Sequence, residues 1–217
     1  MRAILLLLFL ILDVSCLELY GIDVSSNQKN INWKEVAKTK RFAIIRAGYG
    51  YGTLDNYWDT NYKGAKAARI KVGAYWDSYA DSVEAAKKEA NSMLKAVQGK
   101  QLEWPVYYHL EYQPIFDKNL QNEIATTFCR ILESHRYFCG ILSSAYLLTH
   151  KFSDRIDDTF TTWVSHYGVS KPSYSGAYRI WQKEYGKVDG VNGACNIDVS
   201  DTDFEPIIKR GRHNGFK

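Results

Sequence analysis

The chain has 217 residues, 46% of them hydrophobic, and a formal net charge of +4. This length and composition predict one compact domain, and the charge is too small and too scattered to indicate nucleic-acid binding, although it favours an anionic surface. No stretch after residue 16 reaches the roughly 20 apolar residues of a spanning helix, so we expect no stable membrane insertion. A monomer is the default expectation.

The N-terminus has the pattern of a secretory signal. Arg2 supplies a positive charge, residues 3–12 are uninterrupted apolar chain, and Val14, Ser15 and Cys16 are compact enough for a cleavage site. We therefore expect residues 1–16 to be removed and residues 17–217 to form a single domain. The mature protein would be secreted or held in a vesicular, lysosome-like compartment.

Three cysteines remain after leader removal: Cys129, Cys139 and Cys195. Their spacing matches no zinc signature. An odd number excludes complete pairing within the chain. Cys129 and Cys139 could bridge a helix to the next strand in an oxidising compartment, or could remain as two buried thiols.

Strand and helix patterns alternate along most of the mature chain. Strands are predicted at residues 20–24, 42–47, 72–79, 104–111 and 138–144, and helices at residues 33–38, 59–69, 81–97 and 119–134. The third helix would begin at a capping box of Asp81 and Glu84.

The rhythm changes after residue 160. Strand-like segments at 160–167, 177–184 and 195–199 are separated by turn-rich stretches with little helical signal. We therefore predict an α/β fold, a TIM-like barrel of five strand–helix units plus three closing strands, in which the first and last strands are neighbours. Residues 210–217 are interpreted as a basic, poorly ordered tail.

Three predicted strands end on a carboxylate. Ile22-Asp23-Val24-Ser25 recurs as Ile197-Asp198-Val199-Ser200, and a further strand ends at Glu111. Because barrel enzymes carry their chemistry at the carboxyl ends of the strands, these acids would share a pocket suited to acid chemistry on a hydroxyl-rich substrate. The alternative is a tetrapeptide that recurs by chance, with acids that cap helices.

Glu111 is the main candidate for a catalytic acid. His109 lies two residues before it, so both side chains would leave the same face of the strand into the barrel mouth. A glycosidase needs a carboxylic acid that stays protonated near neutral pH, and Tyr107, Tyr108 and Leu110 could supply the apolar setting that this requires. The alternative is a strand-end glutamate paired with a basic residue.

Candidate binding residues surround these acids. Gln28 follows Asp23 closely and could bond sugar hydroxyls, although the segment 23–28 also fits a turn or cap. Arg46 is either a structural charge or the partner that keeps one acid ionised. Six aromatic residues could stack on sugar faces or belong to the core and rim: Tyr49, Tyr75, Tyr79, Trp163, Tyr167 and Trp181.

Several of these motifs, in order over nearly the whole mature chain, resemble the glycoside hydrolase family 25 lysozymes, often called the Chalaropsis type. The matching segments are residues 21–28, 44–47, 73–76, 105–111 and the stretch from Trp181-Gln182 to Asp198. The resemblance implies the barrel described above and hydrolysis of the bond between N-acetylmuramic acid and N-acetylglucosamine in bacterial peptidoglycan, without metal or cofactor. Such an enzyme would serve antibacterial defence or the digestion of bacteria.

Carried over by position, Glu111 is the general acid, Asp23 and Asp198 hold and polarise the reacting sugar, and Gln182 joins the substrate-binding residues. The family motif Asp-x-Glu is here His109-Leu-Glu111. The missing aspartate would stabilise the 2-acetamido group of the substrate as it attacks the anomeric carbon, a route outside the two standard carboxylate geometries.

This departure defines two hypotheses. A neutral imidazole at His109 brings no negative charge, and an imidazolium would favour the ionised form of Glu111 and weaken it as an acid. Losing one electrostatic stabiliser costs roughly a hundredfold to a thousandfold in rate, so the chain would be an impaired enzyme, or one in which Asp23 or Asp198 has taken over. The rival is a peptidoglycan-binding protein with a lysozyme fold and no useful turnover.

A second departure is Trp76-Asp77, where the family often has histidine and an aromatic residue. We expect this change to alter the sugar subsites.

Overall fold

The computed structural model describes residues 18–111, 115, 117–152 and 156–217. The expected leader, residues 1–16, lies outside these ranges. Within them, nine strands form one sheet, in which the two-residue β3 pairs with β2 at the edge of a ring made by the other eight. The strands are β1 (Leu19–Val24), β2 (Phe42–Tyr49), β3 (Thr53–Leu54), β4 (Lys71–Asp77), β5 (Val106–Leu110), β6 (Cys139–Ser144), β7 (Thr161–Ser165), β8 (Ile180–Lys187) and β9 (Ala194–Ser200).

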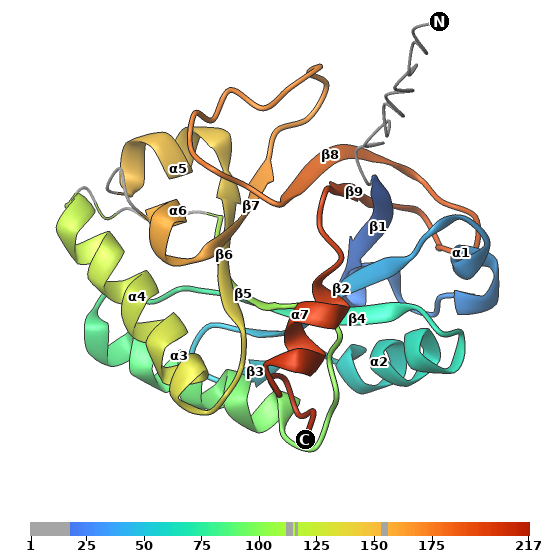
Figure 1. The fold of residues 1–217 in the computed structure, drawn as a ribbon, viewed down its shortest axis with the longest axis horizontal. Helices are drawn as coiled ribbons and strands as arrows, with labels where there is room; N and C mark the ends of the chain where they lie inside the picture. Colours follow the sequence, from blue (N-terminus) through green and yellow to red (C-terminus); the bar gives the residue numbers. More distant parts are fainter. Residues whose placement is uncertain (1–17, 112–114, 116, 153–155) are drawn as a thin grey trace, which may run out of the picture.

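The first and last strands close the ring. β1 pairs in parallel with β2 on one side and antiparallel with β9 on the other. The ring is parallel from β1 to β8, and β9 runs antiparallel to both of its neighbours. The predicted barrel of five strand–helix units and three closing strands is confirmed (Figure 1).

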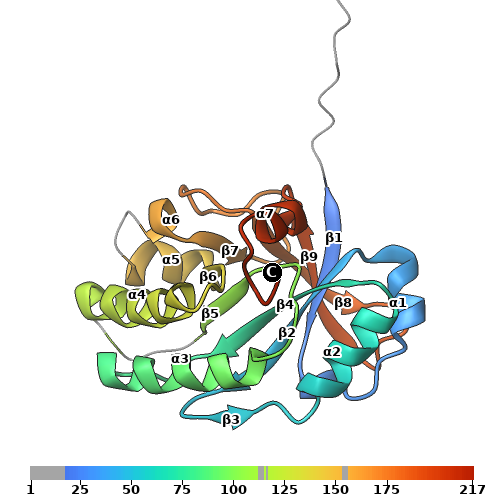
Figure 2. The same ribbon diagram turned by 60° about the horizontal axis from the view of Figure 1, so that its bottom comes forward.

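Helices cover the outside of the barrel. They are α1 (Trp33–Thr39), α2 (Trp58–Ala67), α3 (Val83–Val97), α4 (Lys118–Ser134), α5 (Ala145–Lys151), α6 (Ile156–Thr159) and α7 (Phe204–Arg210), with a 3₁₀ turn at Ser26–Gln28. The helices α1 to α6 lie in the connections between parallel strands, and α3 and α4 pack side by side (Figure 2). In the part of the chain that is described, no helix is long and apolar enough to cross a membrane.

Side chains alternate between the inside and the outside of the barrel, as the two-residue period of a strand requires. On β5, Tyr107 belongs to the cluster that fills the barrel, whereas Tyr108 and Leu110 belong to the larger cluster beneath the helices. On β4, Tyr75 faces inward and Trp76 outward in the same way. The next inward positions on these two strands are therefore the ones that reach the mouth of the barrel.

The C-terminal segment closes the opposite end of the barrel. Phe204 and Ile208 of α7 pack into the inner cluster, and Phe204 lies 5.2 Å edge-on from the ring of Trp104. Asn214 is fully buried: its side chain accepts a hydrogen bond from the backbone of Phe138 at 2.7 Å and donates one to Trp104 at 2.8 Å. The prediction of a poorly ordered tail was wrong, because one buried asparagine satisfies two backbone groups that would otherwise lack partners.

Two local predictions concern the cap of α3 and the positions of two cysteines. Helix α3 is capped by Ser82, which accepts a hydrogen bond from the amide of Ala85, rather than by Asp81. The sulfurs of Cys129 on α4 and Cys139 on β6 lie 2.7 Å apart in the core. The helix and the next strand therefore meet at these residues, while their covalent pairing stays a prediction.

Candidate active site

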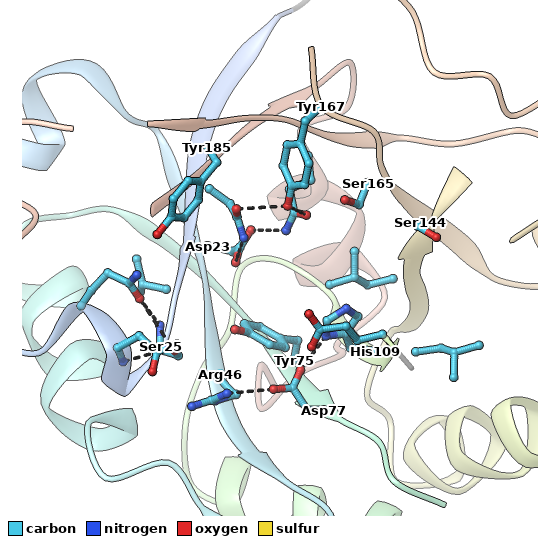
Figure 3. Close-up of a pocket in the computed structure, with 18 residues that line it drawn as sticks. Asp23, Ser25, Arg46, Tyr75, Asp77, His109, Ser144, Ser165, Tyr167 and Tyr185 are labelled. Atoms are coloured by element: carbon cyan, nitrogen blue, oxygen red, sulfur yellow. Dashed lines mark hydrogen bonds and ion pairs between the residues drawn. The ribbon is translucent and has the colours of Figure 1, made fainter. Parts of the chain in front are cut away.

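A cleft of about 360 Å³ opens at the carboxyl ends of the parallel strands (Figure 3). The residues that line it come from every strand of the ring. Among those predicted from the sequence, the cleft brings together Asp23, Gln28, Arg46, Tyr75, His109, Glu111, Tyr167 and Gln182. This is the end of the barrel at which enzymes of this architecture carry their chemistry.

Asp23 is held at the end of β1 by two amides. Gln182 Nε2 donates to Asp23 Oδ2 at 2.6 Å, and Asn196 Nδ2 donates to Oδ1 at 3.0 Å. Burial raises the pKa of Asp23 from 3.8 to about 6, although these hydrogen bonds and the nearby His109 oppose the rise. The two amides fix the carboxyl group of Asp23 in position, but its ionisation lowers the free energy of unfolding because the group is buried.

Tyr167 supports the same two amides. Its single hydroxyl proton is shared between Oε1 of Gln182 and, at 3.1 Å, Oδ1 of Asn196. Each amide therefore presents its NH₂ group to Asp23, because its oxygen is engaged by the tyrosine. Burial raises the pKa of Tyr167 to about 12, so the hydroxyl keeps its proton.

Asp198 lies beneath the cleft and does not line it. The residue is fully buried, Trp163 Nε1 donates to its Oδ1 at 3.0 Å, and its Oδ2 has no hydrogen-bond partner among the described residues. Burial, followed by the charge of Asp23, raises the pKa of Asp198 well above its usual value. The expected proximity of Asp23 and Asp198 is found, but direct contact of Asp198 with a sugar is not supported, because Asp198 lies one layer deeper in the barrel than the cleft-lining Asn196.

Arg46, Asp77 and His109 form a chain of hydrogen-bonded side chains along one wall of the cleft (Figure 3). Asp77 Oδ1 lies 2.5 Å from His109 Nδ1, and Arg46 Nη1 donates to Asp77 Oδ2 at 2.9 Å. Burial favours the neutral acid, but the hydrogen bonds and charges of His109 and Arg46 outweigh it and lower the pKa of Asp77. Asp77 is therefore a carboxylate that occupies the hydrogen-bonding position at Nδ1 of the imidazole.

Arg46 also holds a second carboxylate. Its Nε donates to Asp55 Oδ2 at 2.9 Å, and its Nη2 donates to Ser26 Oγ at 3.2 Å. The pairing of β2 with β4 is irregular between Arg46 and Gly48, a bulge of the kind that re-aims a side chain near a site. The interpretation of Arg46 as the partner of an acid is supported, but its partners are Asp77 and Asp55 and not one of the acids predicted.

Glu111 follows β5 and stands at the rim of the cleft. His109 and Glu111 both line the cleft, as their spacing predicts, but the Glu111 side chain is exposed. Tyr107 and Leu110 point into the two hydrophobic clusters instead of around the carboxyl group. Among the described residues the expected apolar setting is not found, because Tyr107 lies deeper in the barrel on the same face as Glu111 and Leu110 points to the other face.

Gln28 lines the cleft with both ends of its amide engaged. Its Oε1 accepts from the Ser25 amide at 3.0 Å, and its Nε2 donates to the carbonyl of Ala194 at 2.9 Å. Ser25 caps the short 3₁₀ turn in return. The segment after Asp23 therefore forms a cap, which was the alternative prediction. The hydrogen bond from Gln28 to Ala194 links it to β9.

Four of the predicted aromatic residues do not line the cleft. Trp163 is fully buried inside the barrel. Trp181 faces outward, packs against the outer cluster and donates from Nε1 to the carbonyl of His166. The ring centroids of Tyr49 and Tyr79 lie 6.1 Å apart, and neither residue lines the cleft. Stacking on sugars is therefore not supported for Trp163 and Trp181, and it stays a prediction for Tyr49 and Tyr79.

The sequence did not point to several polar residues of the cleft, namely Asn196, Asp77, Tyr185, Ser144 and Ser165. Asp77 was noticed only as a departure from a family pattern. The alternation on β4 could have revealed it, since Tyr75 and Asp77 are two residues apart and share a face. Among the residues that the structure describes, no group of three or more His, Cys, Asp or Glu side chains is arranged to hold a metal ion.

Comparison with known proteins gives one family and several relatives. A sequence model of Glycosyl hydrolases family 25 matches residues 22–191. YegX of Escherichia coli O6:H1, an uncharacterised protein, is 27% identical over 207 residues, covering 92% of this chain and 75% of its own. The autolytic lysozyme of Clostridium acetobutylicum is 25% identical over 185 residues, covering 82% of this chain and 54% of its own.

A solved structure shares the fold. The bacterial lysozyme of Streptomyces coelicolor superimposes with a TM-score of 0.76 at 23% identity, covering 92% of this chain and 98% of that one.

Proposed function

The chain belongs to glycosyl hydrolase family 25, and we propose that it hydrolyses the β-1,4 bond between N-acetylmuramic acid and N-acetylglucosamine in bacterial peptidoglycan. The observation that carries the proposal is the shared cleft of Glu111 and Asp23 at the carboxyl ends of the barrel strands. The similarity to an autolytic lysozyme over 82% of the chain supports the same substrate class.

Glu111 acts as the general acid in this proposal. Its exposed carboxyl group at the rim can reach the oxygen that leaves the anomeric carbon. Asp23, fixed by Gln182 and Asn196, orients the reacting sugar and opposes the positive charge that develops on its ring. Asp198 acts through its neighbours, because it lies beneath the cleft floor.

A second candidate is a peptidoglycan-binding protein without useful turnover. The observation that favours it is the environment of His109. Burial disfavours the imidazolium, but the hydrogen bond that His109 donates to Asp77 and the charges of Asp77, Glu111 and Asp23 outweigh burial and raise the pKa of His109. A positive charge two residues from the acid works against proton donation.

The two candidates are separated by the release of reducing sugar from purified peptidoglycan between about pH 4 and about pH 8. We expect activity in the wild type and a loss of at least about a hundredfold in Glu111→Gln. Glu84→Gln, which removes an exposed glutamate of α3, is the matched control. A wild type that sediments with peptidoglycan but releases no sugar would favour the binding protein.

We also propose that the enzyme acts outside the cytosol, as a monomer, on the walls of bacteria. The leader pattern in residues 1–16 supports export. N-terminal sequencing of protein from the producing cells tests it: a mature chain that begins at residue 17 is expected, and one that retains Arg2 contradicts export.

A further inference from the structure

The Asp77–His109 pair has a geometry that the activity proposed above does not explain. In the parallel pairing of β4 with β5, Asp77 lies directly across from His109. The carboxylate and the imidazole Nδ1 are 2.5 Å apart. Both residues line the cleft on the wall that also carries Glu111.

Asp77 is held so that it can orient the ring. Arg46 engages its second oxygen at 2.9 Å, and Arg46 is itself fixed by the buried Asp55. Tyr75 meets the imidazole edge-on, with ring centroids 5.7 Å apart, and restricts its rotation. The orientation of the imidazole is thus set by Asp77 and Tyr75 of β4, with Arg46 of β2 holding Asp77.

A fixed carboxylate at Nδ1 also selects the tautomer. Asp77 accepts the Nδ1 proton, so in the neutral imidazole Nε2 carries a lone pair. Within the described residues the imidazole forms no hydrogen bond through Nε2. The two nitrogens lie on opposite flanks of the ring, so Nε2 faces away from Asp77 and is the nitrogen open to a ligand in the cleft.

We propose that Asp77 is a positioning residue that makes His109 the acceptor for the 2-acetamido N–H of the substrate. The proposal rests on the hydrolysis proposed above. Asp77 then supplies the negative charge and His109 supplies the hydrogen-bond acceptor. An aspartate at position 109 would supply both alone. It also differs from the expectation that Asp23 or Asp198 takes over, since neither contacts His109 by a hydrogen bond within the described residues.

Two successive displacements at the anomeric carbon make up the proposed reaction. The acetamido oxygen forms a bond to the anomeric carbon, the glycosidic bond breaks, and Glu111 gives its proton to the leaving oxygen. The acetamido N–H, which becomes acidic as positive charge develops, passes its proton to His109 Nε2. Water then attacks the anomeric carbon and loses a proton to Glu111, the carbon–oxygen bond to the acetamido group breaks, and Nε2 returns the proton to the nitrogen.

The charges around His109 support this use of the ring. Asp77 on β4, Asp23 on β1 and Glu111 after β5 all favour the imidazolium, and they outweigh its burial. Nε2 is therefore a stronger base than in a free histidine, and the imidazolium that forms is stabilised by Asp77 without movement of the protein.

A double-mutant cycle tests the proposal by measuring kcat and KM on soluble peptidoglycan fragments. Asp77→Asn is expected to lower kcat by roughly a hundredfold or more with little change in KM. In the His109→Asp background, which provides a carboxylate directly, the same substitution should change kcat by less than about threefold or raise it, because it removes a like charge. Equal losses in both backgrounds would mean that Asp77 acts independently of His109, and would overturn the proposal.

Asp55→Asn is the matched control. Asp55 accepts a hydrogen bond from the same arginine at 2.9 Å but has no contact with the imidazole. Its substitution should lower kcat by less than about tenfold. A loss as large as that of Asp77→Asn would assign the effect to Arg46 and contradict positioning of the imidazole.

A second measurement does not depend on turnover. Nitrogen-15 chemical shifts of the His109 ring, above the pKa of the imidazole, report which nitrogen carries the proton. We expect the Nδ1–H form in the wild type and its loss as the single form in Asp77→Asn. The Nε2–H form in the wild type would refute the proposal even in an active enzyme.

Failure of hydrolysis is recognised separately. A wild type that releases no reducing sugar contradicts the proposed function, and the nitrogen shifts alone then decide whether Asp77 sets the tautomer. An active wild type that is inactivated by Glu111→Gln but unaffected by Asp77→Asn keeps the proposed function and overturns the role of Asp77.

Discussion

Asp23→Asn should stabilise the folded protein in a pH-dependent way. Burial raises the pKa of Asp23 from 3.8 to about 6, so the folded state binds this proton more tightly than the unfolded state does. The free energy of unfolding of the wild type therefore falls as pH rises between about 4 and about 6, and the loss is complete above that window. The substitution removes this loss, because an amide does not ionise.

The size of this pH-dependent change in unfolding free energy follows from the two pKa values of Asp23. The rise is roughly 2 pH units, and each unit corresponds to about 1.36 kcal/mol, so the pH-dependent contribution is about 3 kcal/mol. The lost carboxylate hydrogen bonds from Gln182 and Asn196 shift the variant by an amount that does not depend on pH in this window. Burial, the largest cause of the raised pKa of Asp198, is the same in both proteins.

Urea unfolding followed by tryptophan fluorescence at a series of pH values measures the effect. The difference in unfolding free energy between Asp23→Asn and the wild type should grow by about 3 kcal/mol from about pH 3.5 to about pH 7 in favour of the variant. Asp189→Asn, at an exposed position, controls for the loss of one carboxylate. A difference that stays constant across this range would refute the argument that ionised Asp23 is costly to bury.

Three further predictions concern other parts of the molecule. In an oxidising buffer, peptide mapping should find a Cys129–Cys139 disulfide, and reduction should lower stability by roughly 2 to 3 kcal/mol; two thiols that still react with iodoacetamide after unfolding would contradict it. Asn214→Ala should destabilise the fold by about 2 to 4 kcal/mol in urea titrations, because two buried backbone groups lose their partners. Gln182→Leu removes a donor to Asp23 and should raise the pKa of Asp23 above 6, which moves the acid limb of the rate profile to higher pH; an unmoved limb would show that ionised Asp23 is not required.

The arrangement of the barrel could be predicted from the sequence because its signals are local. Continuous apolar runs such as residues 42–47 and amphipathic stretches such as residues 119–134 carry the period of the element that they form. Parallel strands joined by helices must end at the same edge of a sheet, so Asp23, His109 and Glu111 could be assigned to one mouth without coordinates. The recurring Ile-Asp-Val-Ser pattern likewise marked two strands that prove to be neighbours.

Only the tertiary structure decided which of these groups touch. Asp77 meets His109 because β4 and β5 pair in one particular register, and a slip of one residue would turn either side chain to the other face. Asp198 shares the inward face of Asn196 but lies one layer deeper in the barrel, beneath the cleft floor, and Glu111 is exposed at the rim. Periodicity along one strand contains no information about register between strands, and that register, together with the packing of α7 and the C-terminal segment, is determined by the side chains of the whole barrel at once.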